Sequence, residues 1–185
     1  PDFTSPIYHP LNESLCQEFK TNLELIGGQV ILIKSKSEIA NQVKLICEEK
    51  NLSRIFCTDP KLQKILKENI DIDSDENSFL ELNIGVTGCE FLVAHLGSVI
   101  ISSAQISGRR LNVFPETHIV VADQSQITAY LDHALEKLQN KYKNELPSLI
   151  SNITGPSRTA DIEKTLVMGM HGPKSLIVII SEEPL

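Results

Sequence analysis

The stretch Gln29-Val-Ile-Leu-Ile-Lys34 decides the fold class, because it has the length and composition of a short buried strand. Gly27 and Gly28 stand directly before it and end a helical pattern that Asn12 can cap. The apolar residues of that pattern share one helical face: Leu15, Phe19, Leu23 and Ile26. A helix that leads directly into a buried strand indicates an α/β arrangement.

The same alternation continues toward the C-terminus. Ser37 begins a second helical pattern, and Arg54-Ile-Phe-Cys-Thr58 is typical of the next strand. Asp59-Pro60 combines a capping residue with proline at the first helical position, which predicts a helix through about Asn69. Further segments are predicted as a polar loop (71–78), short strands with turns (84–102), a strand (117–122), a helix (125–143), a helix (159–168) and a strand (175–181).

This pattern predicts a single α/β domain over residues 1–185, with three layers and a largely parallel sheet covered on both faces. Residues 1–80 form its N-terminal helix and strand portion, and residues 84–181 form the core that carries the motifs. Ligands of such sheets bind beyond the carboxyl ends of the strands, so the loops that follow the strands are the candidate sites.

The composition is that of a globular protein, with 41% hydrophobic and 22% charged residues. The 17 basic and 24 acidic residues give a net charge of −7, which argues against nucleic acid as a partner. The apolar stretches are too short to span a membrane. Cys16, Cys47, Cys57 and Cys89 are scattered without metal-site spacing, so we expect reduced, mostly buried thiols in a cytoplasmic protein and no metal site.

The first candidate loop is Gly85-Val-Thr-Gly-Cys-Glu90. Its glycines let the backbone approach a ligand, while Thr87 and Glu90 offer a hydroxyl and a carboxylate. The alternative interpretation is that the glycines serve tight turns and that Glu90 is a solvated or capping acid. Cys89 as a nucleophile with a histidine base is a further, weaker hypothesis, because a buried thiol is inert unless its thiolate is stabilised.

The second candidate segment is Ser107-Gly-Arg-Arg110, followed by Pro115-Glu-Thr-His118. A guanidinium group binds carboxylate or phosphate bidentately, and Arg110 is the arginine we expect to face a site. His118 begins a predicted buried strand and is either a proton donor or anion ligand, or a structural histidine.

The third candidate segment is Thr154-Gly-Pro-Ser-Arg-Thr-Ala-Asp-Ile-Glu163, with His171-Gly-Pro173 beyond it. A glycine-containing loop at the start of a helix suits an anion, and Ser157, Arg158 and Thr159 add donors. Asp161 and Glu163 would sit in the first turn, where acids also serve simply to balance the helix dipole.

Taken together, these segments resemble the LUD domain family. The segments that carry the resemblance run from Gly85 to Ala94, from Val113 to Val121 and from Ile153 to Glu163, with the His171-Gly-Pro173 motif. The resemblance implies a fold similar to the NagB/RpiA/CoA-transferase superfamily. It also implies a role in L-lactate oxidation to pyruvate with iron–sulfur partner subunits. Ala94-His-Leu-Gly-Ser98 departs from the family, because His95 and Leu96 replace the usual acid and hydroxyl.

Combining the residues with the resemblance, we predict a site whose members fall into two groups. The candidate catalytic residues are Glu90, His118, Asp161 and His171, and the candidate anion-binding residues are Thr87, Gly88, Ser98, Arg110, Gly155, Ser157, Arg158 and Thr159. The ligand is a small carboxylate or another anion. The chain itself carries no iron–sulfur or flavin motif, so cofactors are expected in the partner subunits.

Two other functional classes stay open from the sequence. One is a stand-alone enzyme similar to CoA transferases or 5-formyltetrahydrofolate cyclo-ligase, with Glu90 or Glu116 as nucleophile. The other is a non-catalytic scaffold or regulator. The sequence also leaves open whether the chain forms a homo-oligomer.

Overall fold

A computed structural model describes residues 8, 10–52, 54–75, 83–108, 110–143, 145–160, 166–169 and 172–185 of the chain, and only the backbone of residues 159, 160 and 166–168. Its helices are α1 (Leu15–Leu25), α2 (Ile39–Glu49), α3 (Pro60–Leu66) and α4 (Leu131–Tyr142), with 3₁₀ turns η1 (Lys36–Glu38), η3 (Ala94–Leu96) and η4 (Gln124–Gln126). Its strands are β1 (Gln29–Ile33), β2 (Arg54–Phe56), β3 (Asp71–Asp73), β4 (Ile84–Thr87), β5 (Phe91–Val93), β6 (Ser98–Ser102), β7 (Thr117–Asp123), β8 (Ile127–Thr128), β9 (Ile150–Ile153), β10 (Arg158–Ala160), β11 (Leu166–Met168) and β12 (Ser175–Ser181).

The central sheet has six strands in the order β1-β12-β7-β4-β2-β3, and all of its pairings are parallel. A second sheet, in the order β8-β5-β6-β9, is mixed, and β10 pairs with β11 as an antiparallel ribbon. The predicted α/β class with a largely parallel sheet is therefore confirmed.

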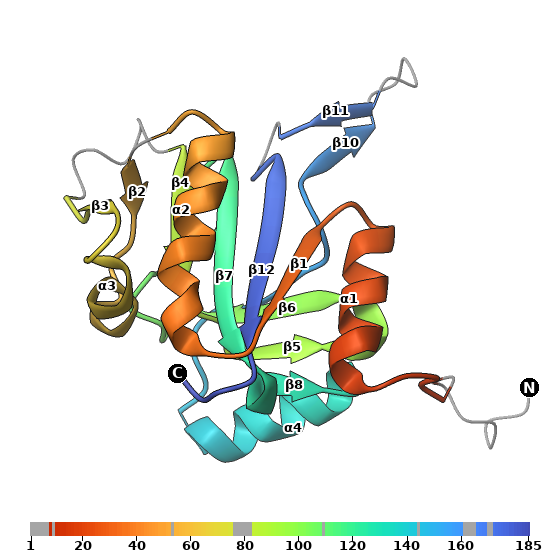
Figure 1. The fold of residues 1–185 in the computed structure, drawn as a ribbon. Coiled ribbons are helices and arrows are strands. Elements are labelled where there is room, and N and C mark those ends of the chain that lie inside the picture. Colours follow the sequence, from red (N-terminus) through yellow and green to blue (C-terminus); the bar gives the residue numbers. More distant parts are fainter. Residues whose placement is uncertain are drawn as a thin grey trace, which may run out of the picture.

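Side chains that alternate along the central strands divide the core into two clusters. On β12, Ile177 and Ile179 pack with the apolar faces of α2 and α3, whereas Leu176, Val178 and Ile180 pack with α1, β5 and β6. The six-stranded sheet thus lies between α2 and α3 on one face and α1 with the second sheet on the other (Figure 1).

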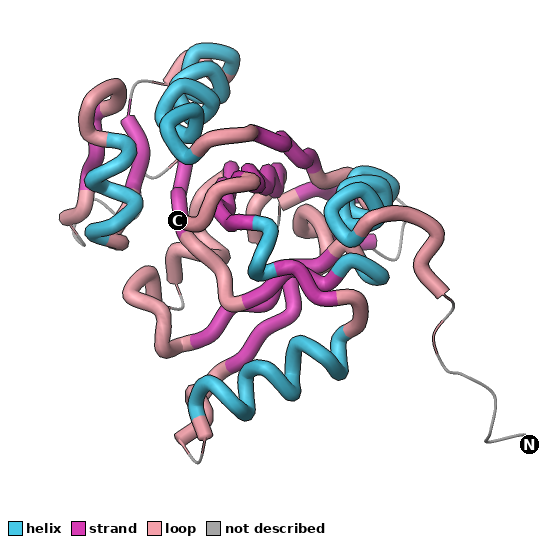
Figure 2. The backbone as a smooth tube through the Cα atoms, turned by 60° about the horizontal axis from the view of Figure 1, so that its bottom comes forward, coloured by secondary structure: helices cyan, strands magenta, loops and turns pink. Residues whose placement is uncertain are grey.

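Helix α4 covers the far side of the second sheet (Figure 2). Its buried residues Ala134 and Leu138 pack against Val93 and Ile100 of that sheet. The carboxyl ends of the central strands point toward this part of the molecule (Figure 1). The loops that follow β2 and β4 therefore meet the end of α4, and this meeting point is where a ligand site is expected.

Several predicted elements are confirmed with small shifts at their ends. The strand at Gln29 is β1, and Asp59 caps α3 by accepting a hydrogen bond from the backbone of Lys61, with Pro60 as the first helical residue. The cap of α1 is Ser14 rather than Asn12, and Ser35 caps the turn before α2.

Three predicted elements are wrong. Residues 71–78 do not begin as a loop, because Asp71–Asp73 pairs in parallel with β2 as an edge strand. The helix expected from residue 125 begins at Leu131, since Ile127 and Thr128 pair with β5. The helix expected over residues 159–168 is replaced by strands β10 and β11, so the helix start invoked for anion binding does not exist at Thr159.

Candidate functional site

A hollow of about 460 Å³ lies beyond the carboxyl ends of β2 and β4. We call it the carboxyl-end hollow. Four segments form its walls: the turn after β4, the start of α3, the segment after β6 and the end of α4. Its lining residues are Asp59, Pro60, Lys61, Gly88, Cys89, Glu90, Ala104, Gln105, Ile106, Ser107, Lys141 and Tyr142. Two of the predicted site residues, Gly88 and Glu90, are therefore placed in this hollow.

The carboxylate of Glu90 is almost completely buried, with 3% exposure, and is held by three donors. Ser102 Oγ donates to Oε1 at 2.6 Å, Tyr142 Oη donates to Oε1 at 2.7 Å and Lys141 Nζ donates to Oε2 at 2.7 Å. These contacts join the turn after β4 to the end of β6 and to the last turn of α4. Glu90 thus anchors one wall of the hollow.

The protonation state of Glu90 follows from the balance of these contacts. Burial raises the pKa of the carboxyl group, but the hydrogen bonds from Lys141, Ser102 and Tyr142 lower it more, so the pKa lies below its ordinary value. Glu90 is therefore ionised at neutral pH, with both oxygens engaged. A catalytic role for Glu90, as predicted from the sequence, requires this network to break first.

Other groups in the hollow are less engaged. Ser107 Oγ is buried and has no hydrogen-bond partner among the described residues. Gln105 accepts a hydrogen bond from the backbone of Ser102 at 3.0 Å, while Lys61 is exposed at the start of α3. Gly88 leaves space, because an added Cβ would meet no atom closer than 4.0 Å. The hollow thus offers a hydroxyl, an ammonium group and open backbone.

Cys89 also lines the hollow, but its thiol is unsuited to attack. The side chain is 8% exposed, and burial raises the pKa of the thiol far above its ordinary value. The thiolate is the nucleophilic form, so Cys89 stays in its unreactive form at neutral pH. This finding weakens the cysteine-nucleophile hypothesis.

His118 lies outside the lining of the hollow and is paired with Thr87. Thr87 Oγ1 and His118 Nε2 are 2.8 Å apart, and both residues are fully buried. Burial lowers the pKa of His118 to about 4, so the ring is neutral at pH 7. His118 Nδ1 has no partner among the described residues. Thr87 immediately precedes Gly88, which places this buried pair next in the chain to the wall of the hollow.

Ser98 and Arg110 lie in different surroundings from each other. Ser98 is fully buried at the start of β6, and its Oγ has no hydrogen-bond partner among the described residues. Arg110 is exposed in the segment between β6 and β7, where its carbonyl accepts hydrogen bonds from the backbone of Val113 and Phe114. Neither residue lines the carboxyl-end hollow.

The segment Gly155–Arg158 packs on the end of α1 instead of on the hollow. Arg158 donates a hydrogen bond to the carbonyl of Ile26, the residue that caps α1. Gly155 has a positive φ of 80° and lies against the same carbonyl. A cation at the carboxyl end of a helix is favourable for the helix dipole. The described contacts of Arg158 are thus those of a helix cap.

Ser157 connects the third candidate segment to the Gly172-Pro173 motif. Its backbone nitrogen donates to the carbonyl of Pro173 at 2.8 Å, and its carbonyl accepts from Gly169 at 3.0 Å. The structure describes the backbone of Thr159 but not its side chain, and Asp161, Glu163 and His171 lie outside the described residues. The ligand roles of this segment stay predictions.

Sequence reasoning missed two residues that line the hollow, Lys141 and Tyr142, and a third partner of Glu90, Ser102, which lies outside the lining. Lys141, Tyr142 and Ser102 reach Glu90 from positions 51, 52 and 12 residues away in the chain. Lysine and tyrosine at the end of an amphipathic helix give no local signal of a site. Ser107 was part of the second candidate segment, which was chosen for its adjacent arginines, and it was not predicted as a site residue.

His95 lies away from the hollow. Its ring packs edge-on to Tyr8 at 5.6 Å and tilted against Tyr130 at 5.5 Å, and Tyr8 stacks on Tyr130 at 4.6 Å. Asn22 of α1 donates to the carbonyls of Ala94 and His95. His95 is therefore part of an aromatic cluster beside α1.

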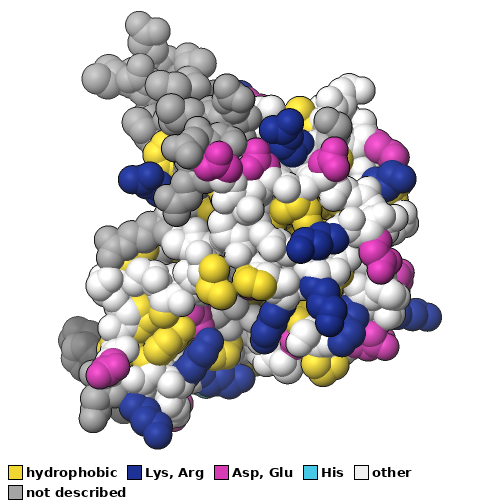
Figure 3. Space-filling model, turned by 90° about the vertical axis from the view of Figure 1, so that its left-hand side faces the viewer, with side chains coloured by type: hydrophobic (Ala, Val, Ile, Leu, Met, Phe, Trp, Pro, Cys, Tyr) yellow, Lys and Arg dark blue, Asp and Glu magenta, His cyan; other side chains and the backbone are white. Residues whose placement is uncertain are grey.

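The side of the molecule that carries α3 is rich in basic groups. Lys and Arg side chains gather in the lower half of this face with hydrophobic side chains between them, whereas Asp and Glu lie mainly toward its top and sides (Figure 3). This distribution contrasts with the net charge of −7 of the whole chain.

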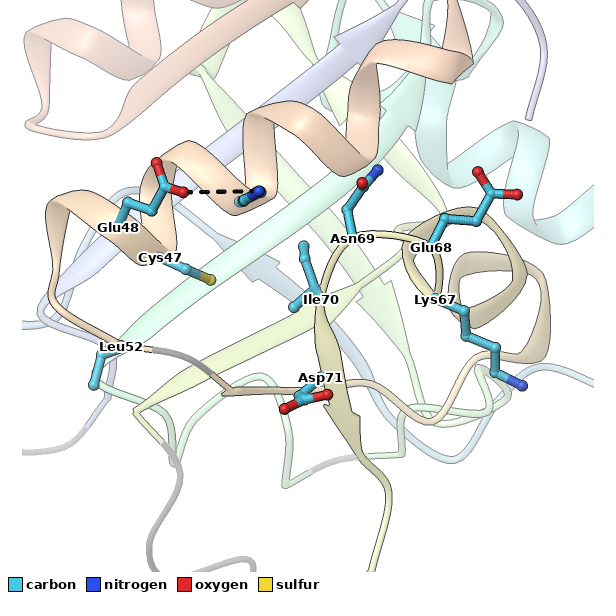
Figure 4. A pocket seen from close by; sticks show the side chains of 9 residues that line it. Cys47, Glu48, Leu52, Lys67, Glu68, Asn69, Ile70 and Asp71 are labelled. Atoms are coloured by element: carbon cyan, nitrogen blue, oxygen red, sulfur yellow. Dashed lines mark ion pairs between the residues drawn. The ribbon is translucent and has the colours of Figure 1, made fainter.

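A second hollow, of about 470 Å³, lies at the opposite end of β2 and β3. Figure 4 shows the thiol of Cys47 on α2 pointing toward Ile70, while the carboxylate of Glu48 is directed along the helix in an ion pair with Lys44 at 4.0 Å. It contains none of the predicted site residues and lies at the amino ends of the strands. Ligands of parallel sheets bind at the other end, so this hollow is a weaker candidate.

Two absences hold for the described part of the chain. It contains no group of His, Cys, Asp and Glu side chains that could hold a metal ion. None of its helices has the length and apolar character that crossing a membrane requires.

All four cysteines are free thiols, and Cys47, Cys57 and Cys89 are buried.

Comparison with known proteins gives relatives and a structural neighbour. The chain is 35% identical over 105 residues to lactate utilization protein C of Bacillus subtilis, covering 55% of this chain and 44% of that protein. It is 36% identical over 105 residues to lactate utilization protein C of Bacillus licheniformis, covering 56% and 44%. The aligned part therefore spans less than half the length of these curated relatives.

The fold also matches a solved structure. The crystal structure of a DUF162 family protein from Deinococcus radiodurans superposes with a TM-score of 0.70 at 19% identity, covering 93% of this chain and 99% of that chain. The family model of the LUD domain matches residues 16–181. The chain, from α1 to the end of β12, thus belongs to the LUD domain family.

Proposed function

We propose that this chain takes part in lactate utilization by binding a small carboxylate in the carboxyl-end hollow. The curated relatives named lactate utilization protein C support the role in lactate utilization. The observation that carries the site is the buried, unpartnered hydroxyl of Ser107 in a hollow that also contains Lys61. A buried hydroxyl without a partner is costly, and a carboxylate would supply the acceptor.

The charges of the hollow are consistent with an anionic ligand. Glu90 is neutralised by Lys141 and by two hydroxyl donors, and one oxygen of Asp59 accepts the backbone hydrogen bond that caps α3. Lys61 forms no ion pair with a described residue. An incoming carboxylate would therefore meet an ammonium group that forms no ion pair with a described residue, together with a hydroxyl that has no described partner.

We also propose that iron–sulfur subunits of the same system perform the electron transfer in the cytoplasm. The resemblance to the LUD domain family implies these partners. The chain would contribute the ligand site, and the partner subunits would contribute the clusters.

The structure favours this role over a CoA-transferase-like enzyme. A glutamate nucleophile needs an oxygen that is free to attack an acyl group. Both oxygens of Glu90 are engaged by Ser102, Tyr142 and Lys141, and Glu116 is bound to Lys174.

Titration of the isotope-labelled protein with L-lactate and pyruvate, followed by NMR, tests the ligand proposal. We expect shifts in residues that line the hollow, and at least about tenfold weaker binding for Ser107→Ala and Lys61→Gln, because each removes a donor. Lys64→Gln is the matched control, since Lys64 is on the same helix but does not line the hollow. Absence of binding to the wild type, or equal binding by all variants, would refute the proposal.

A further inference from the structure

The two acidic side chains that line the carboxyl-end hollow, Asp59 and Glu90, differ in how their oxygens are used. Both oxygens of Glu90 accept hydrogen bonds from side-chain donors. Asp59 Oδ1 accepts a hydrogen bond from the backbone nitrogen of Lys61 at 2.8 Å. Asp59 Oδ2, in contrast, forms no hydrogen bond or ion pair with a described residue. The lining of the hollow therefore contains a carboxylate oxygen that can still accept a hydrogen bond.

The role of Asp59 in the fold uses only one of its oxygens. An acidic N-cap is favourable for a helix because it supplies an acceptor and balances the helix dipole. The cap of α3 uses Oδ1 alone, and asparagine or serine would supply the same acceptor. Asp59 is half-buried in the wall of the hollow, so a ligand that fills the hollow lies against this side chain.

Asp59 and Ser107 lie on adjacent segments of the wall. Thr58 Oγ1 donates a hydrogen bond to the carbonyl of Ile106 at 3.5 Å. Asp59 and Ser107 each follow one member of this pair in the chain, and both line the hollow. Ser107 Oγ is buried and has no hydrogen-bond partner among the described residues, so the two side chains are not bonded to each other. The wall thus offers a carboxylate acceptor and an unpartnered hydroxyl donor on neighbouring segments.

These two groups are complementary to a ligand that carries a hydroxyl group next to a carboxylate. The ligand hydroxyl would donate to Asp59 Oδ2, and the ligand carboxylate would accept from Ser107 Oγ and from the ammonium group of Lys61. A keto group next to the carboxylate has no proton to donate. Its oxygen would face the carboxylate of Asp59 as a second acceptor, and this arrangement is repulsive.

We propose that Asp59 is the specificity-determining residue of the carboxyl-end hollow and makes it a site for a 2-hydroxy acid in preference to the corresponding 2-oxo acid. The inference rests on the proposed function, because a small carboxylate has to bind in this hollow. Oxidation of the bound 2-hydroxy acid would remove the proton that Asp59 recognises. The oxidised product would then bind more weakly than the substrate and leave the hollow.

NMR titration of the isotope-labelled protein with L-lactate and with pyruvate, for the wild type and three variants, tests the inference. Asp59→Asn keeps the acceptor that caps α3 and replaces Oδ2 by an amide donor. Asp59→Ser also keeps a cap but has no second oxygen. Asp132→Asn is the matched control, because Asp132 accepts a hydrogen bond from the backbone of His133 at 2.9 Å in the first turn of α4 and does not line the hollow.

We expect the wild type to bind L-lactate at least about tenfold more tightly than pyruvate, because the keto acid leaves the acceptor of Asp59 unpaired. In Asp59→Asn the ratio of the two dissociation constants should fall to within about twofold or reverse, and in Asp59→Ser it should also fall. Asp132→Asn should keep the wild-type ratio. The ratio is the readout, since removal of a negative charge strengthens the binding of both anions.

The possible failures are distinguishable. If the wild type binds neither acid, the proposed function fails and this inference fails with it. If the wild type binds both acids equally or prefers pyruvate, or if Asp59→Asn and Asp59→Ser keep the wild-type ratio, Asp59 does not determine specificity while the proposed function stands. Urea unfolding checks that both variants keep the fold, and if Asp59→Asn does not fold, the ratio in Asp59→Ser decides.

Discussion

Thr87 Oγ1 and His118 Nε2 lie 2.8 Å apart between two central parallel strands, and neither residue is exposed to solvent. The hydroxyl group can donate or accept, so it pairs with Nε2 in either tautomer of the neutral ring. The other ring nitrogen, Nδ1, has no hydrogen-bond partner among the described residues. A buried charge on this ring would therefore be poorly compensated.

Acid should destabilise the protein through His118. Burial lowers the pKa of His118 to about 4, whereas its side chain in the unfolded chain has the ordinary pKa of 6.5. Between these values the unfolded chain binds more protons, so the contribution is fully present above pH 6.5 and is lost as the pH falls toward 4. The expected loss in the free energy of unfolding is about 3 kcal/mol at pH 4 relative to pH 7. Urea unfolding across this range measures it.

His118→Gln is the matched variant for this prediction. The glutamine side chain has an amide group that can pair with Thr87 in place of the histidine ring, and this amide does not titrate. The difference in unfolding free energy between wild type and His118→Gln should therefore shrink as the pH falls from 7 to 4. A difference that stays constant over this range would show that His118 is not the titrating group.

Removing the charge of Glu90 should loosen the wall of the carboxyl-end hollow. Glu90→Gln removes the acceptor of the Lys141 ammonium group and weakens the hydrogen bonds from Ser102 and Tyr142. We expect the free energy of unfolding to fall by about 2 kcal/mol at pH 7, because hydrogen bonds to a buried charge are the strong ones. Thermal and urea unfolding measure the loss.

The Glu90 effect also has a defined pH dependence. The folded pKa lies below the ordinary value of 4.5, so the stabilisation is present above that pH and is lost as the pH falls through the folded pKa. Glu116→Gln is the control, because Glu116 is exposed and its ion pair with Lys174 is on the surface. Equal losses for the two variants would contradict the anchoring role.

Arg158 offers a test that separates a cap from a ligand contact. Its hydrogen bond to the Ile26 carbonyl predicts that Arg158→Ala lowers stability by about 1 kcal/mol. If the cap is its main role, the variant should bind L-lactate as wild type does in the NMR titration. Loss of L-lactate binding with unchanged stability would instead support the ligand role predicted from the sequence.

The parts of the fold that could be predicted are those with local signals. β1, β7 and β12 each contain a continuous apolar run, and Asp59-Pro60 defines the start of α3. The errors arise where tertiary pairing overrides local pattern. Asp71–Asp73 is polar, yet it pairs with β2, and residues 159–168 carry a capping-like start that is overridden by the pairing of β10 with β11.

The candidate site was predicted from the place of its loops after the strands more than from the residue types in those loops. The rule that ligands bind after the strands pointed to Gly88 and Glu90, which do line the hollow. The partners of Glu90 could not be predicted, because Lys141 and Tyr142 belong to a helix 51 and 52 residues further along. Only the packing of α4 on the second sheet brings them there.

Two glycines with similar backbone angles should respond differently to substitution. Gly97 and Gly108 have φ values of 58° and 64°, in the left-handed region that disfavours alanine. An added Cβ at Gly108 meets nothing within 4 Å, whereas at Gly97 it would lie 2.5 Å from the backbone carbon of Asn22 and 2.7 Å from Leu23 Cα. Gly108→Ala should thus cost about 1 kcal/mol, the conformational cost alone.

Gly97→Ala should cost about 3 kcal/mol or more, because α1 has to move away from η3 as well. This movement would also break the hydrogen bond from Asn22 to the Ala94 carbonyl, which is 2.9 Å long. Urea unfolding of both variants measures the difference. Equal losses would mean that α1 adjusts without cost, and the close approach of Gly97 to α1 would then not contribute to how the second sheet is held against the helix.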